Sequence, residues 1–487
     1  MNDGSSTANL VRDLRVELDR YSPGEKLPSS RALVERHRVS PVTVSRALRQ
    51  LVAEGLVVTR PGAGAFRAEP RAAVSAPGDT SWQELALSAD PAPASDPAAH
   101  RGAEVVPRSV DASDLLATLA PPRSGVIELS GGYLHPALQP ERALAAALAR
   151  AGRRPGAWER PPTEGIAELR GWFAREIGGV APSQVLVTGG GQPALTGALR
   201  ALAAPGEAVL VESPTYPGML AAARAFGLRP VPVPLDAGGV RTDLLADAFR
   251  ATGARVFVCQ PLFQNPTTAV LAAERRREVL RIARRAGAFV IEDDFARRLG
   301  HEDAGALPPT LASEDPDGTV VHVTSLTKAA SPSLRVGAVA ARGPVLERLR
   351  AVQVVDSFFV SRPLQETALE LVGSPAWGRH LRAVAAELRT RRGAMLAALA
   401  AELPQWPAAR VSPGGFHLWL RLPDGTDERA LADAALRAGV AVAAGRHYFP
   451  AEPPAPHLRL SFVCAASVAE LTEGVRRLRD AWAAVGS

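Results

Sequence analysis

Two lysines stand out in this sequence because arginine replaces lysine almost everywhere else. Of the 56 basic residues, only Lys26 and Lys328 are lysines. Arginine substitutes readily for lysine on a surface, but its guanidinium keeps its proton at useful pH and cannot act as an amine nucleophile. A lysine retained against this bias is a candidate for covalent amine chemistry, and chance retention is the alternative.

Lys328 belongs to a set of polar residues that each follow a short apolar run. Ser325 precedes it by three residues, Arg335 follows it by seven, and Asp293 follows another run. The glycine-rich segment 188–192 also follows a run and opens a helix, where backbone N–H groups can hold a phosphate. Each signal is weak alone. Together, an amine, a carboxylate and a phosphate cradle are the groups that pyridoxal 5′-phosphate (PLP) requires.

The apolar runs predict the elements that would position these residues. They are rich in β-branched residues, alternate with Ala-, Leu- and Arg-rich helices, and lie at 185–187, 208–211, 256–258, 289–291 and 320–323. This alternation is typical of an α/β domain with a mainly parallel sheet, whose ligands bind at the carboxyl ends of the strands. We expect this domain to span residues 126–487.

Three short helices and a hairpin are predicted before residue 70. Apolar residues at helical spacing over 10–18 indicate the first helix, Ser29 or Ser30 can cap the second, and Pro41 suits the first turn of the third. Two strands around the turn at 60–64 form the hairpin. Val44, Leu48 and Leu51 of the third helix should face inward. This pattern predicts a winged helix-turn-helix over residues 1–70.

Composition bounds the remaining possibilities. The chain has 487 residues, a length that predicts at least two domains. Its net charge is +6. Residues 71–125 are rich in Ala, Pro, Ser and Asp and predict a linker, in which 82–87 is one short amphipathic piece. With no apolar run long enough for a signal peptide or membrane span, we expect a cytoplasmic protein. Cys259 and Cys464 lack metal-ligand spacing, so buried thiols and no metal site are expected.

The first 70 residues resemble the GntR-type winged helix through the segments 27–31, 39–40, 43–44, 54–56 and 62–66. The resemblance implies binding to a double-stranded DNA operator, and a winged helix used only for protein contacts is the alternative. Pro41 departs from the polar residue that the family often has there. The residues expected to meet DNA are Arg31, Ser40, Val42, Thr43, Ser45, Arg46, Arg60, Gly62 and Gly64.

Residues 126–487 resemble fold-type-I aminotransferases, in particular the MocR-type subfamily of GntR regulators. The matching segments, in family order, are 188–192, 212–218, 264–267, 291–294, 325–335, 414–420 and 458–460. The resemblance implies PLP as cofactor, with Lys328 as the Schiff-base lysine, Asp293 as the partner of the pyridine nitrogen, and Arg459 as the ligand of a substrate carboxylate. The other residues expected around the cofactor are Tyr216, Asn265, Gly190, Gly191, Gln192, Ser325, Arg335 and Phe295.

Three features of the sequence depart from the pattern of the family. Phe295 replaces a tyrosine that usually hydrogen-bonds the 3′ oxygen of the cofactor, so reactivity should be altered while cofactor binding survives. Thr268 stands where a glycine usually follows the Asn-Pro-Thr motif. Pro217 and Gly218 follow Tyr216 where members that recognise γ-aminobutyrate have an arginine, which disfavours that effector.

The leading hypothesis is a homodimeric transcriptional regulator that senses PLP or an amino compound through an aldimine at Lys328. The first alternative is a working aminotransferase with an attached winged helix, in which Lys328 would move a proton as general acid and base. The second is a binding module without cofactor. Phe295 favours weak or no physiological transaminase activity. The sequence alone does not decide whether the protein is an enzyme.

Overall fold

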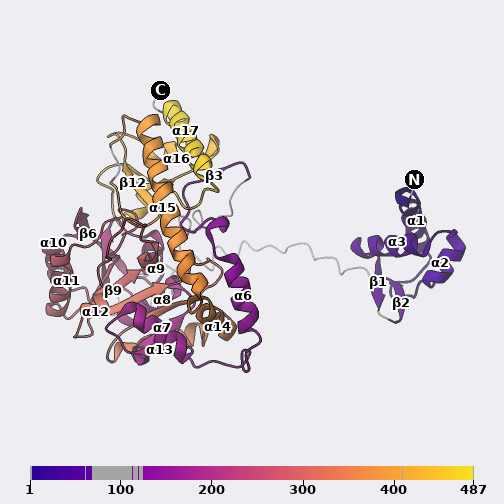
Figure 1. Cartoon of the computed structure of the whole chain (residues 1–487), viewed down its shortest axis with the longest axis horizontal. Coiled ribbons are helices and arrows are strands. Elements are labelled where there is room, and N and C mark those ends of the chain that lie inside the picture. The colour runs from indigo at the N-terminus through magenta and orange to yellow at the C-terminus, as the bar shows by residue number, and fades with distance from the viewer. Residues whose placement is uncertain are drawn as a thin grey trace, which may run out of the picture. The chain divides into compact units, whose positions relative to one another are not determined.

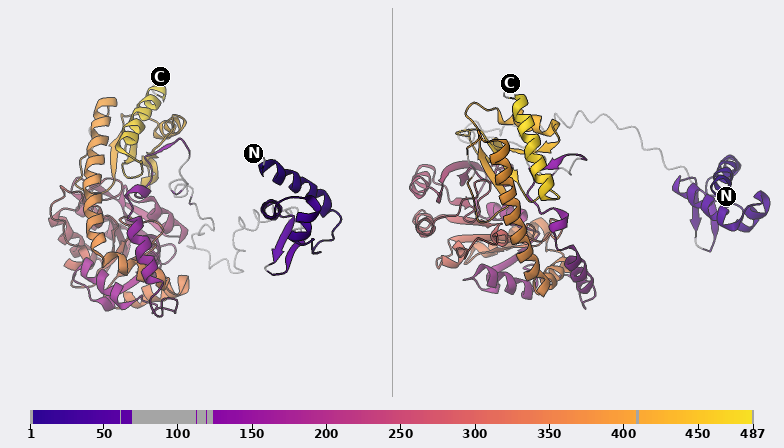
Figure 2. Two further views of the ribbon diagram at one scale, coloured as in Figure 1. Left: turned by 45° about the vertical axis from the view of Figure 1, so that its right-hand side comes forward. Right: turned by 45° about the horizontal axis from the view of Figure 1, so that its top comes forward.

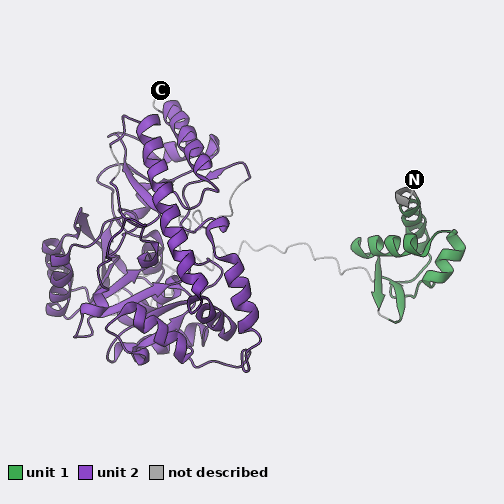
Figure 3. Cartoon of the chain, viewed as in Figure 1, with its two compact units in different colours: residues 1–89 green, residues 90–487 purple. Residues whose placement is uncertain are grey.

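The computed structural model describes residues 3–60, 62–68, 112, 119, 124–407 and 410–485. The chain divides into two compact units, Met1–Ala89 and Asp90–Ser487 (Figure 3). Most of the expected linker at 71–125, including the amphipathic piece at 82–87, lies outside the described residues. No helix in the described parts of the chain is long and apolar enough to cross a membrane.

The first unit has the order of elements that the sequence predicts. It consists of α1 (Asp3–Leu18), α2 (Ser30–His37), α3 (Pro41–Ala53), β1 (Val57–Arg60) and β2 (Gly64–Arg67). The Ser29 side chain caps α2 by accepting a hydrogen bond from the Ala32 amide, and the Ser40 side chain caps α3 by accepting one from the Thr43 amide. The strands β1 and β2 pair antiparallel and form the wing.

The apolar face of α3 holds this unit together. Val44, Leu48 and Leu51 are buried, as expected, beside Leu33 of α2. Val42, Ser45 and Arg46 lie on the exposed face. The structure corrects our expectation that the Thr43 side chain meets DNA. This side chain is only 4% exposed, and its hydroxyl lies 2.8 Å from that of Ser40.

The second unit is built on an eight-stranded sheet with the order β4-β11-β10-β9-β8-β5-β6-β7. Its strands are β4 (Val185–Thr188), β5 (Ala208–Ser213), β6 (Arg229–Asp236), β7 (Gly239–Val240), β8 (Val256–Cys259), β9 (Phe289–Asp294), β10 (Val320–Ser325) and β11 (Gly337–Ala340). β11 is antiparallel to both its neighbours and β7 is antiparallel to β6, whereas the other pairs are parallel. The expected mainly parallel sheet is therefore confirmed.

Helices surround this sheet (Figure 1). They are α6 (Glu141–Ala151), α7 (Ala167–Ile177), α8 (Gly191–Leu202), α9 (Pro217–Ala225), α10 (Thr242–Thr252), α11 (Ala273–Arg285), α12 (Leu311–Glu314), α13 (Val345–Ser357) and α14 (Arg362–Val372). Apolar residues on both faces of the sheet pack against them in two large clusters, of which the second includes Leu186, Val211 and Ile291. The central strands are thus buried on both sides, as their continuous apolar sequence predicts.

A smaller layer completes the second unit. The long helix α15 (Pro375–Glu402) leads away from the large sheet and packs beside α17 (Val468–Val485), as Figure 2 shows from two sides. Between them in sequence lie β12 (His417–Arg421), α16 (Glu428–Arg437), β13 (Val440–Ala441), β14 (Ala443–Ala444) and β15 (His457–Ser461). β12, β15 and β14 form a three-stranded sheet, and β13 pairs with β3 (Ile127–Glu128). This layer brings segments from both ends of the unit to the large sheet.

Candidate functional site

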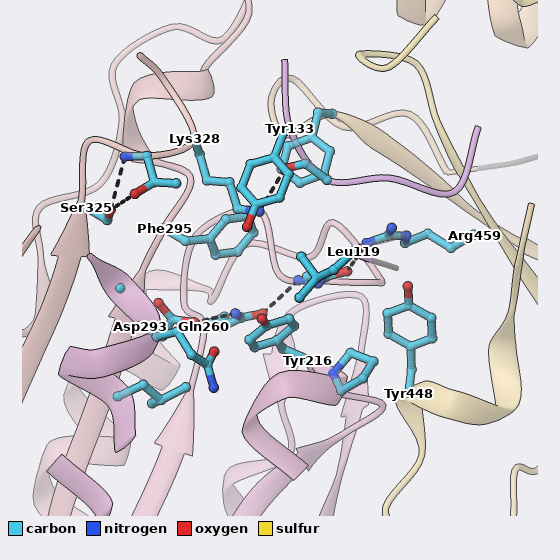
Figure 4. A pocket seen from close by; sticks show the side chains of 18 of the residues that line it. Leu119, Tyr133, Tyr216, Gln260, Asp293, Phe295, Ser325, Lys328, Tyr448 and Arg459 are labelled. Atoms are coloured by element: carbon cyan, nitrogen blue, oxygen red, sulfur yellow. Dashed lines mark hydrogen bonds between the residues drawn. The ribbon is translucent and has the colours of Figure 1, made fainter. Parts of the chain in front are cut away.

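A cavity that is partly open to solvent lies at the carboxyl ends of the central strands (Figure 4). Asp293 and Ser325 lie toward one end of it, and Arg459 and Tyr448 toward the other. The structure brings nearly all the expected cofactor and substrate residues to its wall, namely Gly191, Gln192, Tyr216, Asn265, Asp293, Phe295, Ser325, Lys328, Arg335 and Arg459. Gly190 is next to the wall and contacts Arg335.

Lys328 reaches this cavity from the turn that follows β10. Its amine donates a hydrogen bond of 2.8 Å to the Gly132 carbonyl and lies 3.9 Å from the centre of the Tyr133 ring. Burial, reinforced by the positive charge of Arg459, lowers the pKa of this amine to about 8. A neutral amine is the reactive form, so the environment of Lys328 favours covalent chemistry near neutral pH.

The lowered pKa of Lys328 predicts how covalent capture of PLP depends on pH. Below about pH 8 the neutral fraction of the amine falls roughly tenfold for each pH unit. The initial rate of capture should therefore rise about tenfold between pH 6 and pH 7 and level off above about pH 8.5. Stopped-flow absorbance at the visible band measures this rate. A rate that keeps rising up to pH 10 would show an amine with the ordinary pKa of lysine.

Asp293 lies at the end of β9 and is held by Gln260. The Gln260 side-chain amide donates a hydrogen bond of 2.6 Å to the Asp293 carboxylate. The Gln260 side-chain oxygen accepts a hydrogen bond of 2.9 Å from the backbone amide of Asn265. Burial raises the pKa of Asp293 to about 6, against the opposing effect of the Gln260 hydrogen bond. The carboxylate is therefore ionised at neutral pH and can pair with a protonated ring nitrogen.

The residues predicted to hold a phosphate lie together, between the start of α8 and the loop after β10. Gly190 has φ +108°, and a Cβ atom there would lie 3.1 Å from the Arg335 guanidinium, so this approach requires glycine. Ser325 adds a hydroxyl on the same side as Gly191, whose added Cβ would lie 3.5 Å from the Ser325 side chain. No described residue accepts a hydrogen bond from the Arg335 side chain, which leaves its donors for an anion.

Arg459 lies on β15 and is only 4% exposed. One terminal nitrogen donates to the Asn265 side-chain oxygen at 3.1 Å, and the other donates to the carbonyls of Ser130 and Gly131. Its Nε has no hydrogen-bond partner among the described residues. A guanidinium in a cavity wall can pair with a carboxylate, so the binding of a substrate carboxylate by Arg459 stays a prediction.

These groups fit PLP. The set offers an amine of lowered pKa, a buried carboxylate, a glycine and arginine cradle for a phosphate, and the Tyr216 ring. When bound to such a lysine, PLP acts as an electron sink toward the amino compound attached to it. Phe295 lies in the cavity wall beside Phe416, with ring centres 6.1 Å apart, and supplies no hydroxyl there.

Several wall residues were not anticipated from the sequence, among them Gln260, Tyr133 and Tyr448. Gln260 directly follows β8, so the rule that polar residues at strand ends bind ligands could have identified it. Tyr133 comes from the segment after β3 and Tyr448 from the short 3-10 helix Gly445–Tyr448, far apart in sequence, and no local pattern marks them. The pairing of β3 with β13, and the three-stranded sheet, bring these segments to the cavity.

The first unit carries a second candidate surface. Arg31, Ser40, Val42, Ser45 and Arg46 are exposed on α2, at the start of α3 and along it. The wing residues Arg60, Gly62 and Gly64 are exposed as well, and both glycines have positive φ. An exposed helix face next to a glycine-rich wing is the geometry with which winged helices approach DNA.

Comparison with known proteins agrees with both predicted domains. Residues 8–66 match the family of bacterial regulatory proteins called the gntR family, and residues 125–478 match aminotransferase class I and II. The chain is 28% identical over 486 residues to the HTH-type transcriptional regulator TauR of Rhodobacter capsulatus, covering 95% of this chain and 93% of that protein. It is 33% identical over 362 residues to 2-aminoadipate transaminase of Thermus thermophilus, covering 73% of this chain and 90% of that protein.

A solved structure supports the fold of the second unit. LysN, the alpha-aminoadipate aminotransferase of Thermus thermophilus complexed with N-(5′-phosphopyridoxyl)-L-leucine, superposes with a TM-score of 0.71 at 31% identity. The match covers 77% of this chain and 96% of that one. The chain therefore belongs to the aminotransferase class I and II family. Together with its gntR-family domain, it has the domain organisation of the MocR-type regulators.

Proposed function

We propose that this protein is a DNA-binding transcriptional regulator that senses PLP, or an amino compound reacting with it, at Lys328. The observation that carries the proposal is that one chain holds both an exposed winged-helix face and a cavity whose wall residues fit PLP. The similarity to TauR over 95% of the chain supports the combination of the two. Ligand binding in the second unit would shift the population of chains able to bind DNA.

In this proposal five residues of the cavity wall have a physical task. Lys328 supplies the neutral amine, Asp293 holds a proton on the ring nitrogen, and Arg335 binds the phosphate. Gln260 keeps the Asp293 carboxylate in place through its 2.6 Å hydrogen bond. Arg459 binds the carboxylate of the amino compound and so orients it relative to Lys328.

A working aminotransferase is the second candidate. It is favoured by the amine of Lys328, whose pKa of about 8 would also suit proton transfer during turnover. Phe295 weighs against it, because the side chain in that wall position cannot donate a hydrogen bond. The two candidates differ in product: an enzyme releases a keto acid, whereas a sensor keeps its ligand.

The experiment is a DNA-binding titration with the full-length chain, using duplexes selected from a random pool. We expect the dissociation constant to change at least about fivefold when PLP, or PLP with an amino acid, is present, which is the lower end of typical coupling. The double variant Arg31→Ala with Arg46→Ala should bind DNA weakly but keep the cofactor spectrum. Unchanged DNA binding together with rapid keto acid release would overturn the proposal in favour of the enzyme.

We also propose a homodimer, as the resemblance to fold-type-I aminotransferases implies. Val355 and Phe358, three residues apart at the end of α13, are 78% and 70% exposed, so a second copy could cover apolar surface there. Sedimentation equilibrium of the full-length chain measures the state directly, and a monomer at micromolar concentration would contradict this part of the proposal.

A further inference from the structure

Glu212 is a buried carboxyl group to which the proposed function gives no task. It lies near the end of β5 and is only 3% exposed. Burial of a carboxyl group to this degree disfavours its charged form, which loses its water, unless a cation compensates for the loss. The charged group that acts on Glu212 in the structure is Asp293, which is itself an acid. The surroundings of Glu212 therefore favour its neutral form.

The hydrogen bonds of Glu212 have the pattern of a neutral acid. The backbone amide of Gln260 donates one of 3.0 Å, and the side-chain amide of Gln264 donates one of 3.2 Å. Both bonds go to the same oxygen, Oε2, and no described residue donates a hydrogen bond to Oε1. A protonated carboxyl group has one oxygen that accepts and one that carries the proton, whereas a carboxylate accepts at both. Oε2 thus matches the accepting oxygen of a protonated Glu212.

The charges around Glu212 agree with this pattern. Burial raises the pKa of Glu212 to about 8, and the charge of Asp293 adds to this effect, against the opposing effect of the two hydrogen bonds. Burial raises the pKa of Asp293 only to about 6. Cys259, at the end of β8, is the titratable group on which the charge of Glu212 acts in turn, and burial raises the pKa of its thiol, which stays neutral. Near neutral pH, the proton of the two acids is therefore on Glu212 and the negative charge is on Asp293.

Gln260 connects the two acids. Its backbone amide donates to Glu212, and its side-chain amide donates to Asp293 at 2.6 Å. Figure 4 shows the Gln260 side chain beside Asp293. The side-chain oxygen of Gln260 accepts a hydrogen bond from the backbone amide of Asn265, another residue of the cavity wall. A displacement of Glu212 would therefore be passed to the segment that carries Gln260 and Asn265.

We infer that Glu212 is a positioning residue that acts as a neutral acid: it holds Gln260, and through Gln260 the Asp293 carboxylate, without adding a second negative charge. This inference rests on the proposed function and adds a residue, with its protonation state, on which the PLP site depends. An ionised Glu212 would raise the pKa of Asp293 further by repulsion. A protonated Asp293 could not pair with a protonated ring nitrogen, so the neutral form of Glu212 protects the function of Asp293.

The first test detects the proton on Glu212 in infrared spectra of the full-length chain without PLP. At pH 7 we expect the carbonyl stretch of a protonated carboxylic acid, which should disappear with a midpoint near pH 8 and be absent from Glu212→Gln. Asp293→Asn is the control and should keep this band, because Asp293 is largely ionised at pH 7. A chain without the band at pH 7, or a band that Asp293→Asn removes and Glu212→Gln keeps, would overturn the inference.

The second test compares the affinity of the variants for PLP at pH 7 by equilibrium dialysis. Glutamine keeps an accepting oxygen and, like the protonated acid, carries a donor on the second atom. Glu212→Gln should therefore change the dissociation constant by less than about threefold, whereas Glu212→Ala, which leaves the Gln260 amide without its acceptor, should raise it about tenfold or more. A loss of about tenfold in Glu212→Gln would contradict the inference, and this comparison with the original chain decides even if Glu212→Ala does not fold.

Failure of the proposed function looks different from failure of this inference. A DNA affinity that responds neither to PLP nor to an amino compound would overturn the proposed function, while the infrared band and the contrast between Glu212→Gln and Glu212→Ala would still support the assignment of Glu212. A DNA affinity that responds to PLP in a chain without the band would overturn only the inference. Running the infrared and DNA titrations on the same samples separates the two outcomes.

Discussion

Replacing Lys328 by alanine should abolish covalent capture of PLP and remove its visible absorption band. The variant keeps Asp293, Arg335 and the glycine cradle, so some PLP still binds, but without a covalent bond the affinity should fall by about two orders of magnitude or more. Equilibrium dialysis measures the affinity, and borohydride reduction followed by mass spectrometry measures the covalent product. DNA binding should then no longer respond to PLP.

The sequence offers a matched control for this experiment. Lys26 is the only other lysine of the chain and lies in the first unit, where it forms an isolated bridge with Phe66 of the wing. Lys26→Ala should therefore leave covalent capture unchanged, with one cofactor fixed per chain after reduction. Lys328→Arg is a second control, because it keeps a positive charge but cannot form the bond. Covalent labelling that persists in Lys328→Ala would refute the role of Lys328.

Replacing Leu51 by alanine should unfold the DNA-binding unit while leaving the PLP site intact. Leu51 is completely buried between α3 and the rest of the small core. A Leu→Ala change in such a position costs about 2–5 kcal/mol of the free energy of unfolding, and units of this size seldom have more than about 3–5 kcal/mol to lose. We expect loss of DNA binding and of the corresponding calorimetric transition, with PLP binding unchanged.

Val52 provides the control for the Leu51 variant. It is the next residue of α3 and is 38% exposed, so Val52→Ala removes apolar atoms from the same helix without opening a cavity in the core. Val52→Ala should lower the free energy of unfolding by no more than about 0.5 kcal/mol, and DNA binding should persist. A Leu51→Ala variant that kept the DNA affinity and thermal transition of the original chain would show that α3 does not support this unit in the way its packing indicates.

The first unit shows how far local sequence determines structure. Ser29, one of the two predicted candidates, caps α2, and Ser40 caps α3, because a side-chain oxygen before a helix satisfies backbone amides that lack a partner within the helix. Thr43 was placed on the wrong face. Its hydroxyl bonds to Ser40 in the first turn, and that turn faces the core, so a polar side chain is buried where a simple face pattern predicted exposure.

In the second unit, the sequence by itself determined the mainly parallel sheet and predicted many of the residues that line one cavity. Continuous apolar runs require strands buried on both faces, and the polar residues after them must gather at one edge of the sheet. Lys328, Asp293 and Arg335 could therefore be identified with only their local sequence and the order of their motifs. The rarity of lysine in this chain added a chemical reason to choose Lys328.

Only the tertiary structure decided what surrounds these groups. The Gly132 carbonyl that accepts the Lys328 hydrogen bond lies 196 residues away in sequence, and the Tyr448 ring beside Arg459 belongs to a short 3-10 helix of the smaller layer. Burial, and hence the pKa of about 8 at Lys328 and about 6 at Asp293, depends on all of these segments meeting. Contacts between distant segments leave no periodic signal in the sequence, so the wall that selects the ligand could be found only in the folded chain.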